Sequence, residues 1–230
     1  MAEPKFGPAG NSESFAAAGF KKSEDAPAWL AQMGLTAFEY QCGRGVRCGE
    51  ETALKIGAAA EQHGIQMSIH APYFINLSSE ESERMEKNVG YVLETARLAV
   101  PLGATRMVVH CGGQGKLTRD RAMRNCRTGG HMNTREEVKA LFDLMENTIG
   151  HERTAKLHAH FSHIEYNDKG EVRHLTFADT IYGPDFTPVA EETAARGYAP
   201  TFICESAGTQ AEDALAMKQC FMDKLEIRNA

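Results

Sequence analysis

The sequence lacks the short motifs that identify the common nucleotide-binding and zinc-ribbon proteins. No GxGxxG or GxxxxGKS/T loop follows a predicted strand, so we expect no nucleotide cofactor. The six cysteines form no CxxC pair, which excludes a zinc ribbon and a thioredoxin motif. Acidic residues outnumber basic ones by 31 to 25, and the net charge of −6 excludes a generally basic surface for nucleic acid, although not a single basic cleft.

Membrane-spanning and secretory segments are also missing. No apolar run approaches the roughly 18–20 residues of a membrane span. The first residues do not combine a basic segment with an apolar one, so we expect no secretory signal, a cytoplasmic location and free thiols. The 230 residues, with an ordinary 42% of hydrophobic residues, are enough for one large domain, and we expect a single domain over 1–230.

Short β-like segments alternate with amphipathic helices along most of the chain. The predicted strands are 5–10, 37–41, 66–70, 106–110, 156–163 and 201–205. The predicted helices are 23–33, 50–63, 79–100, 117–127, 134–149, 185–196 and 210–225. This alternation predicts a parallel sheet covered by helices, in either a barrel or a doubly wound arrangement.

Residues able to bind a metal follow four of these strands. His70, His110, His160 and Glu205 each stand at the carboxyl end of a predicted strand, and His158 shares a face with His160. In a (β/α)₈ barrel that end is the active-site face, whereas in a doubly wound sheet such residues gather near one switch point. Four such residues on one face predict a metal site, and imidazole with carboxylate favours Zn²⁺, with Mn²⁺ or Fe²⁺ as substitutes.

Four segments in chain order, HAPYFINL from residue 70, VVHCG from 108, HFS from 160 and CE from 204, resemble the endonuclease IV family. These are the apurinic/apyrimidinic endonucleases of the xylose-isomerase-like TIM barrel superfamily. The resemblance implies a (β/α)₈ barrel with up to three zinc ions. It also implies an enzyme that cleaves damaged double-stranded DNA 5′ to an abasic site in base excision repair, using a metal-activated hydroxide, and that is a monomer if the barrel is complete.

The resemblance also assigns roles to individual residues. His70 and His110 match ligands of a first metal, and His160 and Glu205 match ligands of a second. His174 lies where a histidine ligand of the third metal is expected. The residues at the reaction centre would be Glu205 and Tyr73, and the DNA-binding residues would be Arg44, Arg47, Tyr73 and Asn76.

The chain departs from the family in two places. Only six of eight barrel strands are recognisable, and the missing two would fall near 127–133, where two predicted helices abut. Val172 replaces the aspartate expected with the third-metal histidine. Three explanations stay open for the short chain: an omitted segment, a real deletion, or a degenerate paralogue that binds without cutting.

These departures affect the expected function. The missing stretch would carry a bridging glutamate, so we expect the chain as written to bind metal more weakly than a complete family member and to cut poorly. The functional alternatives are a single-metal sugar isomerase or epimerase on the same barrel and a catalytically impaired remnant.

Overall fold

The computed structural model describes residues 3–75, 82–110, 134–167 and 170–229, and it contains two three-stranded parallel sheets. The first sheet has the order β1-β8-β5 and the second β2-β3-β4. Their bounds are Lys5–Pro8 (β1), Thr201–Cys204 (β8), His158–Phe161 (β5), Ala37–Gln41 (β2), Gln66–His70 (β3) and Met107–Val108 (β4). The six strands predicted from the sequence are therefore confirmed, several of them at shorter length.

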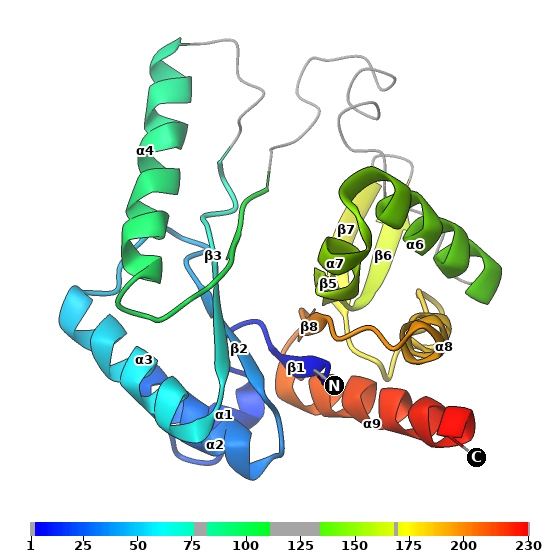
Figure 1. The fold of residues 1–230 in the computed structure, drawn as a ribbon. Helices are drawn as coiled ribbons and strands as arrows, with labels where there is room; N and C mark the ends of the chain where they lie inside the picture. The colour runs from blue at the N-terminus through cyan, green and yellow to red at the C-terminus, as the bar shows by residue number, and fades with distance from the viewer. Residues whose placement is uncertain (1–2, 76–81, 111–133, 168–169, 230) are drawn as a thin grey trace.

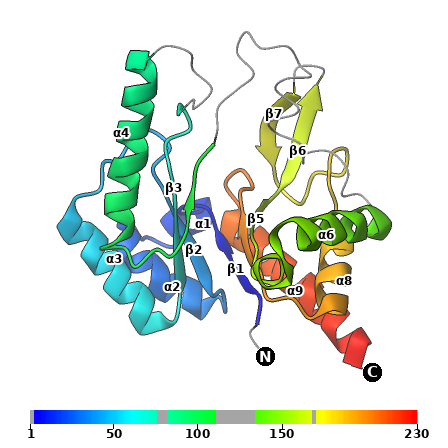
Figure 2. The same cartoon turned by 45° about the horizontal axis from the view of Figure 1, so that its top comes forward.

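The two sheets meet at β1 and β2, which lie side by side between the two halves of the molecule (Figures 1 and 2). A parallel bridge joins Ala9 to Glu39, and the backbones are so close that a Cβ on Gly7 would lie 1.8 Å from the Ala37 carbonyl oxygen. The strands thus form one curved wall in the order β5-β8-β1-β2-β3-β4. This is part of a TIM barrel wall, incomplete in the described residues.

Helices cover the outer face of this wall. They are α1 Glu13–Ala17, η1 Ser23–Asp25, α2 Ala26–Gln32, α3 Glu50–His63, α4 Ser82–Ala99, α6 Arg135–Ile149, α7 His151–Ala155, α8 Thr187–Arg196 and α9 Gln210–Asn229. In Figure 1, α1 to α4 surround β2 and β3, whereas α6 to α9 surround β5 and β8. Strand residues that face the helices, such as Phe38, Ile69 and Phe202, are buried between the strands and the helices. This packing removes their apolar area from water.

The open edges of the wall are β4 and β5. The Arg106 guanidinium spans them: its Nη2 donates to the Lys156 carbonyl at 2.7 Å, and its Nη1 lies 3.4 Å from Thr201 Oγ1. Gln66 Nε2 donates to the same Thr201 hydroxyl oxygen at 3.0 Å. Side-chain hydrogen bonds therefore connect the amino-terminal ends of strands that no described strand joins.

The structure corrects the predicted strand over 156–163. This segment divides after Phe161, and a second strand, β6 (His163–Asn167), pairs antiparallel with β7 (Gly170–Leu175) as a hairpin. The sequence of this hairpin is largely polar and shows little of the hydrophobic alternation that predicts strands. The short α1 was not predicted from the sequence. The predicted helix over 117–127 and the expected junction at 127–133 lie outside the described residues.

The described residues also bear on the thiols and on membrane association. Cys42, Cys48, Cys204 and Cys220 are free, as expected. Within the same part of the chain, no helix combines the length and apolar character that crossing a membrane requires.

Candidate metal centre

Four side chains from four different strands converge inside the wall. Glu39 on β2, His70 on β3, His160 on β5 and Glu205 immediately after β8 each place one ligand atom within 4.8 Å of the others. Glu39 and His70 are fully buried, whereas His160 and Glu205 are partly exposed. Three of these four residues were predicted from the strand ends, and the structure brings them together.

His110 adjoins this group, two residues beyond the end of β4. Its Nε2 lies 3.0 Å from His70 Nε2. His70 Nδ1 lies 2.6 Å from the Ala71 carbonyl oxygen, so Nδ1 carries the proton and Nε2 presents a lone pair to the centre. Burial lowers the pKa of His70, which favours the neutral, metal-binding form. The two Nε2 atoms are therefore placed to share one cation.

His160 lies between two carboxylates. Its Nε2 is 3.0 Å from Glu39 Oε1, and its Nδ1 is 3.0 Å from Glu205 Oε1. Burial opposes the charged imidazolium, but the hydrogen bonds and negative charges of Glu205 and Glu39 raise the pKa of His160 to about 10. The protonated His160 therefore bridges the Glu39 and Glu205 carboxylates. A cation that binds to this imidazole would displace the proton.

His174 reaches the centre from the β6–β7 hairpin. Its Nδ1 lies 2.6 Å from Ser162 Oγ, which leaves Nε2 facing Glu205 Oε2 at 3.9 Å. Val172, two residues earlier on β7, is 46% exposed and offers no ligand atom where the resemblance expects an aspartate. The hairpin thus brings one residue of the predicted pair to the centre.

Glu39 was not singled out from the sequence. It is 0% exposed and accepts a hydrogen bond from Ser68 Oγ at 2.9 Å. Strand alternation carried the signal, because Ala37, Glu39 and Gln41 face one side of β2 while Phe38 and Tyr40 face the helices. Glu39 is in register with Ser68, and Gln41 with His70, so polar residues recur on the inner face of neighbouring strands.

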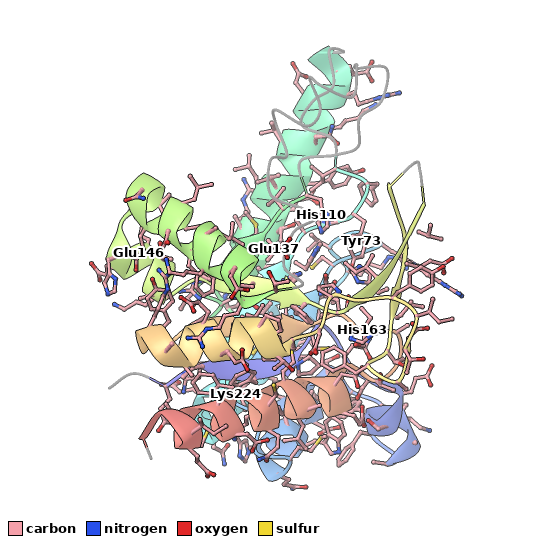
Figure 3. All side chains as sticks on the ribbon, turned by 90° about the vertical axis from the view of Figure 1, so that its right-hand side faces the viewer. Tyr73, His110, Glu137, Glu146, His163 and Lys224 are labelled. Atoms are coloured by element: carbon pink, nitrogen blue, oxygen red, sulfur yellow. The ribbon has the colours of Figure 1, made fainter. Side chains whose placement is uncertain are left out.

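The three predicted DNA-binding residues that can be described line a cleft beside the centre. Arg44, Arg47 and Tyr73 border a cavity of about 410 Å³. The Tyr73 ring lies 4.7 Å from the His70 ring and 5.6 Å from the His110 ring, and Figure 3 shows Tyr73 and His110 close together. Both arginines are exposed, and neither forms an ion pair with another described residue. Asn76 lies outside the described residues.

The donor set fits a divalent cation. Imidazole nitrogens and carboxylate oxygens are the ligands that zinc takes from proteins, and manganese accepts them as well. The ring nitrogens of His70 and His174 that face away from the centre are bound by a backbone carbonyl and a hydroxyl, as is usual for metal-binding histidines.

The chain resembles known proteins in sequence. Residues 27–129 match a family described as xylose isomerase-like TIM barrel. An uncharacterized protein of Methanocaldococcus jannaschii is 25% identical over 247 residues, covering 82% of this chain and 88% of that protein.

Two solved structures show the same similarity. Endonuclease IV from Thermus thermophilus has a TM-score of 0.62 at 19% identity, with 97% of this chain and 100% of that chain covered. An L-ribulose 3-epimerase has a TM-score of 0.56 at 13% identity, with 100% of this chain and 96% of that chain covered. The predicted xylose-isomerase-like TIM barrel fold is therefore confirmed, and it is a fold that an endonuclease and a sugar epimerase share.

Proposed function

We propose that this protein is a divalent-metal-dependent phosphodiesterase of the endonuclease IV type, which cleaves double-stranded DNA 5′ to abasic sites in base excision repair. The observation that carries the proposal is the juxtaposition of two features. A centre of converging imidazoles and carboxylates lies directly beside a cleft lined by two arginines without ion pairs among the described residues. A metal centre for hydrolysis and a cationic cleft for phosphates are the two parts that such a reaction requires.

The metal ligands in this proposal are His70, His110, His160, His174 and Glu205. Zinc is the proposed metal, with up to three ions in a complete centre and manganese as a substitute. When bound, such cations neutralise charge on the phosphodiester and lower the pKa of a coordinated water. The proposed location is the cytoplasm, and a protein with a complete barrel would be a monomer.

The cleft residues would hold the DNA. Arg44 and Arg47 each offer a guanidinium to phosphate oxygens. Tyr73 Oη donates to Gln41 Oε1 at 3.0 Å, and its ring packs so closely on residue 43 that a Cβ on Gly43 would lie 2.7 Å from it. Tyr73 is thereby fixed between the cleft and the histidines, where it can position the scissile phosphate next to Glu205.

Nicking of a duplex with one abasic site, in the presence of zinc, tests this function. We expect slow cleavage on the 5′ side of the lesion that chelator abolishes and that His110→Ala reduces by at least about 100-fold, since a ligand is lost. His63→Ala, at an exposed histidine at the end of α3, is the matched control and keeps full activity. Cleavage that His110→Ala leaves unchanged would refute the proposal.

A single-metal sugar isomerase or epimerase is the second candidate. It is favoured by the two carboxylates, Glu39 and Glu205, on either side of His160, because paired carboxylates suit proton transfer. Zinc content separates the two functions: about three ions support the nuclease and one supports the isomerase, whereas a chain that binds none is a remnant. Conversion of a ketose to its epimer, without nicking of abasic DNA, would decide for the second candidate.

We also propose that two βα units are missing near residues 127–133. The family match ends at residue 129, and β4 and β5 face each other as open edges in the described residues. The alignment with the archaeal protein has 247 positions although only 82% of 230 residues are covered, so that protein carries internal residues that this chain lacks. Intact mass together with DNA sequence around codon 128 tests whether the segment is deleted or omitted.

A further inference from the structure

Glu39 is a buried carboxylate at the centre of the barrel wall. The resemblance to endonuclease IV assigned no metal ligand to strand β2, yet Glu39 there places an oxygen within 4.8 Å of ligand atoms of His70, His160 and Glu205. Burial of a carboxylate is costly unless it is paired or binds a cation. Such a residue in a barrel interior therefore indicates a specific role.

The surroundings of Glu39 hold its carboxylate in one orientation. Oε2 accepts from Ser68 Oγ at 2.9 Å and lies 3.1 Å from His158 Nε2. Oε1 accepts from Gln41 Nε2 at 3.1 Å and lies 3.0 Å from His160 Nε2. Partners that fix a carboxylate in this way are typical of the residues around metal ligands.

We propose that Glu39 is a metal ligand, oriented by Ser68 and His158, and that it supplies from β2 the inner carboxylate of the centre. Its Oε1 faces His160 Nε2, the nitrogen to which a cation would bind. The centre thereby gains a second carboxylate beside Glu205. This ligand compensates in part for the carboxylate that the short chain lacks. The inference rests on the proposed metal centre but not on the proposed reaction.

A structural role is the competing explanation. Glu39 could serve only as the counter-ion of His158 and His160, both of which lie within 3.1 Å of it. In that case its replacement would weaken the fold but leave metal binding intact. The two explanations therefore differ in metal affinity and not in stability.

Calorimetric zinc titration and elemental analysis of purified Glu39→Gln, with circular dichroism to verify folding, separate these explanations. We expect its zinc dissociation constant to rise by more than about 100-fold, and the visible absorption bands of the Co²⁺-loaded protein to change. Glu192→Gln is the matched control, because Glu192 is also a buried carboxylate, and it pairs with Arg196 away from the centre. It should lose stability and keep its metal content.

Ser68→Ala keeps the test decisive where Glu39→Gln does not fold. This variant retains the Glu39 charge and removes one orienting hydrogen bond, so we expect about 10-fold weaker zinc binding. Ser12→Ala, at another buried serine, is its control. Unchanged zinc affinity and an unchanged cobalt spectrum in folded Glu39→Gln, or in Ser68→Ala, would overturn the assignment.

Two further results keep the inference apart from the proposed function. Glu39-dependent zinc binding without nicking of abasic DNA would refute the nuclease and leave the ligand assignment standing. Nicking by a protein whose zinc content is unaffected by Glu39→Gln would do the reverse.

Discussion

Removal of the His160 imidazole tests how the metal-free centre is held together. In the wild type, the His160 imidazole lies 3.0 Å from both the Glu39 and the Glu205 carboxylate. In His160→Gln the two carboxylates face each other without this positively charged group. We expect the free energy of unfolding to fall by several kcal/mol at neutral pH when zinc is removed with chelator. The loss should exceed that of any surface pair, because a buried charge is left without its partner.

The size of this effect follows from the pKa of His160. A rise from 6.5 to about 10 corresponds to about 5 kcal/mol at low pH and to about 4 kcal/mol at pH 7. The pKa is higher in the folded state, so this stabilisation is complete below about pH 6.5 and is lost as the pH rises through about 10. The lowered pKa of Glu39, about 2, reports partly the same interaction, so the two values are not added.

Guanidinium chloride unfolding at pH 7 and pH 10.5, with chelator present, measures this difference. The gap between wild type and His160→Gln should be about 4 kcal/mol at pH 7 and much smaller at pH 10.5. His151→Gln is the control, because it removes an exposed histidine 2.9 Å from Glu146 and should cost less than about 1 kcal/mol. A gap below 1 kcal/mol at pH 7, or one that does not change with pH, would refute this reasoning.

Three further predictions concern the cleft, the joined sheets and the open edges. Arg44→Ala with Arg47→Ala should weaken binding of abasic duplex and reduce the slope of log affinity against log salt by up to about 2, measured by fluorescence anisotropy. Gly7→Ala should lower the melting temperature sharply, because its Cβ would meet a backbone carbonyl at 1.8 Å, whereas Gly90→Ala, in open space within α4, should not. Arg106→Met should cost about 1–3 kcal/mol of unfolding free energy by losing the hydrogen bond to the Lys156 carbonyl, and an unchanged value would show that this span does not support the fold.

The sequence predicted the parallel strands and three members of the metal group because these features are local. Apolar strands bounded by glycines and ending in histidine or glutamate can be recognised one at a time, as at His70 and Glu205. Glu39 could not be recognised in this way, since its importance arises only from the register that sets it beside Ser68 and opposite His160. Site chemistry that depends on neighbouring strands needs the fold.

The hairpin shows a second limit of the sequence. The resemblance pointed to His174 as a possible ligand, and the structure brings it to the centre, but no strand was predicted over residues 164–175, so the hairpin that carries His174 was missed. Antiparallel pairing depends on a partner strand, and the polar residues between 163 and 175 gave little hydrophobic alternation to reveal one. The joining of the two sheets at Gly7 was equally hidden, because it depends on distance between backbones and not on residue type.

The guanidinium that spans β4 and β5 has a mechanical consequence. A closed barrel has no free strand edges, whereas the described wall has two, at β4 and β5, which the Arg106 side chain connects at one rim of the wall. His110 follows β4, and His160 lies on β5, both at the opposite rim. Metal ions bound at this centre would therefore connect the two open edges at the rim opposite Arg106, and metal binding would stabilise the incomplete wall as well as the site.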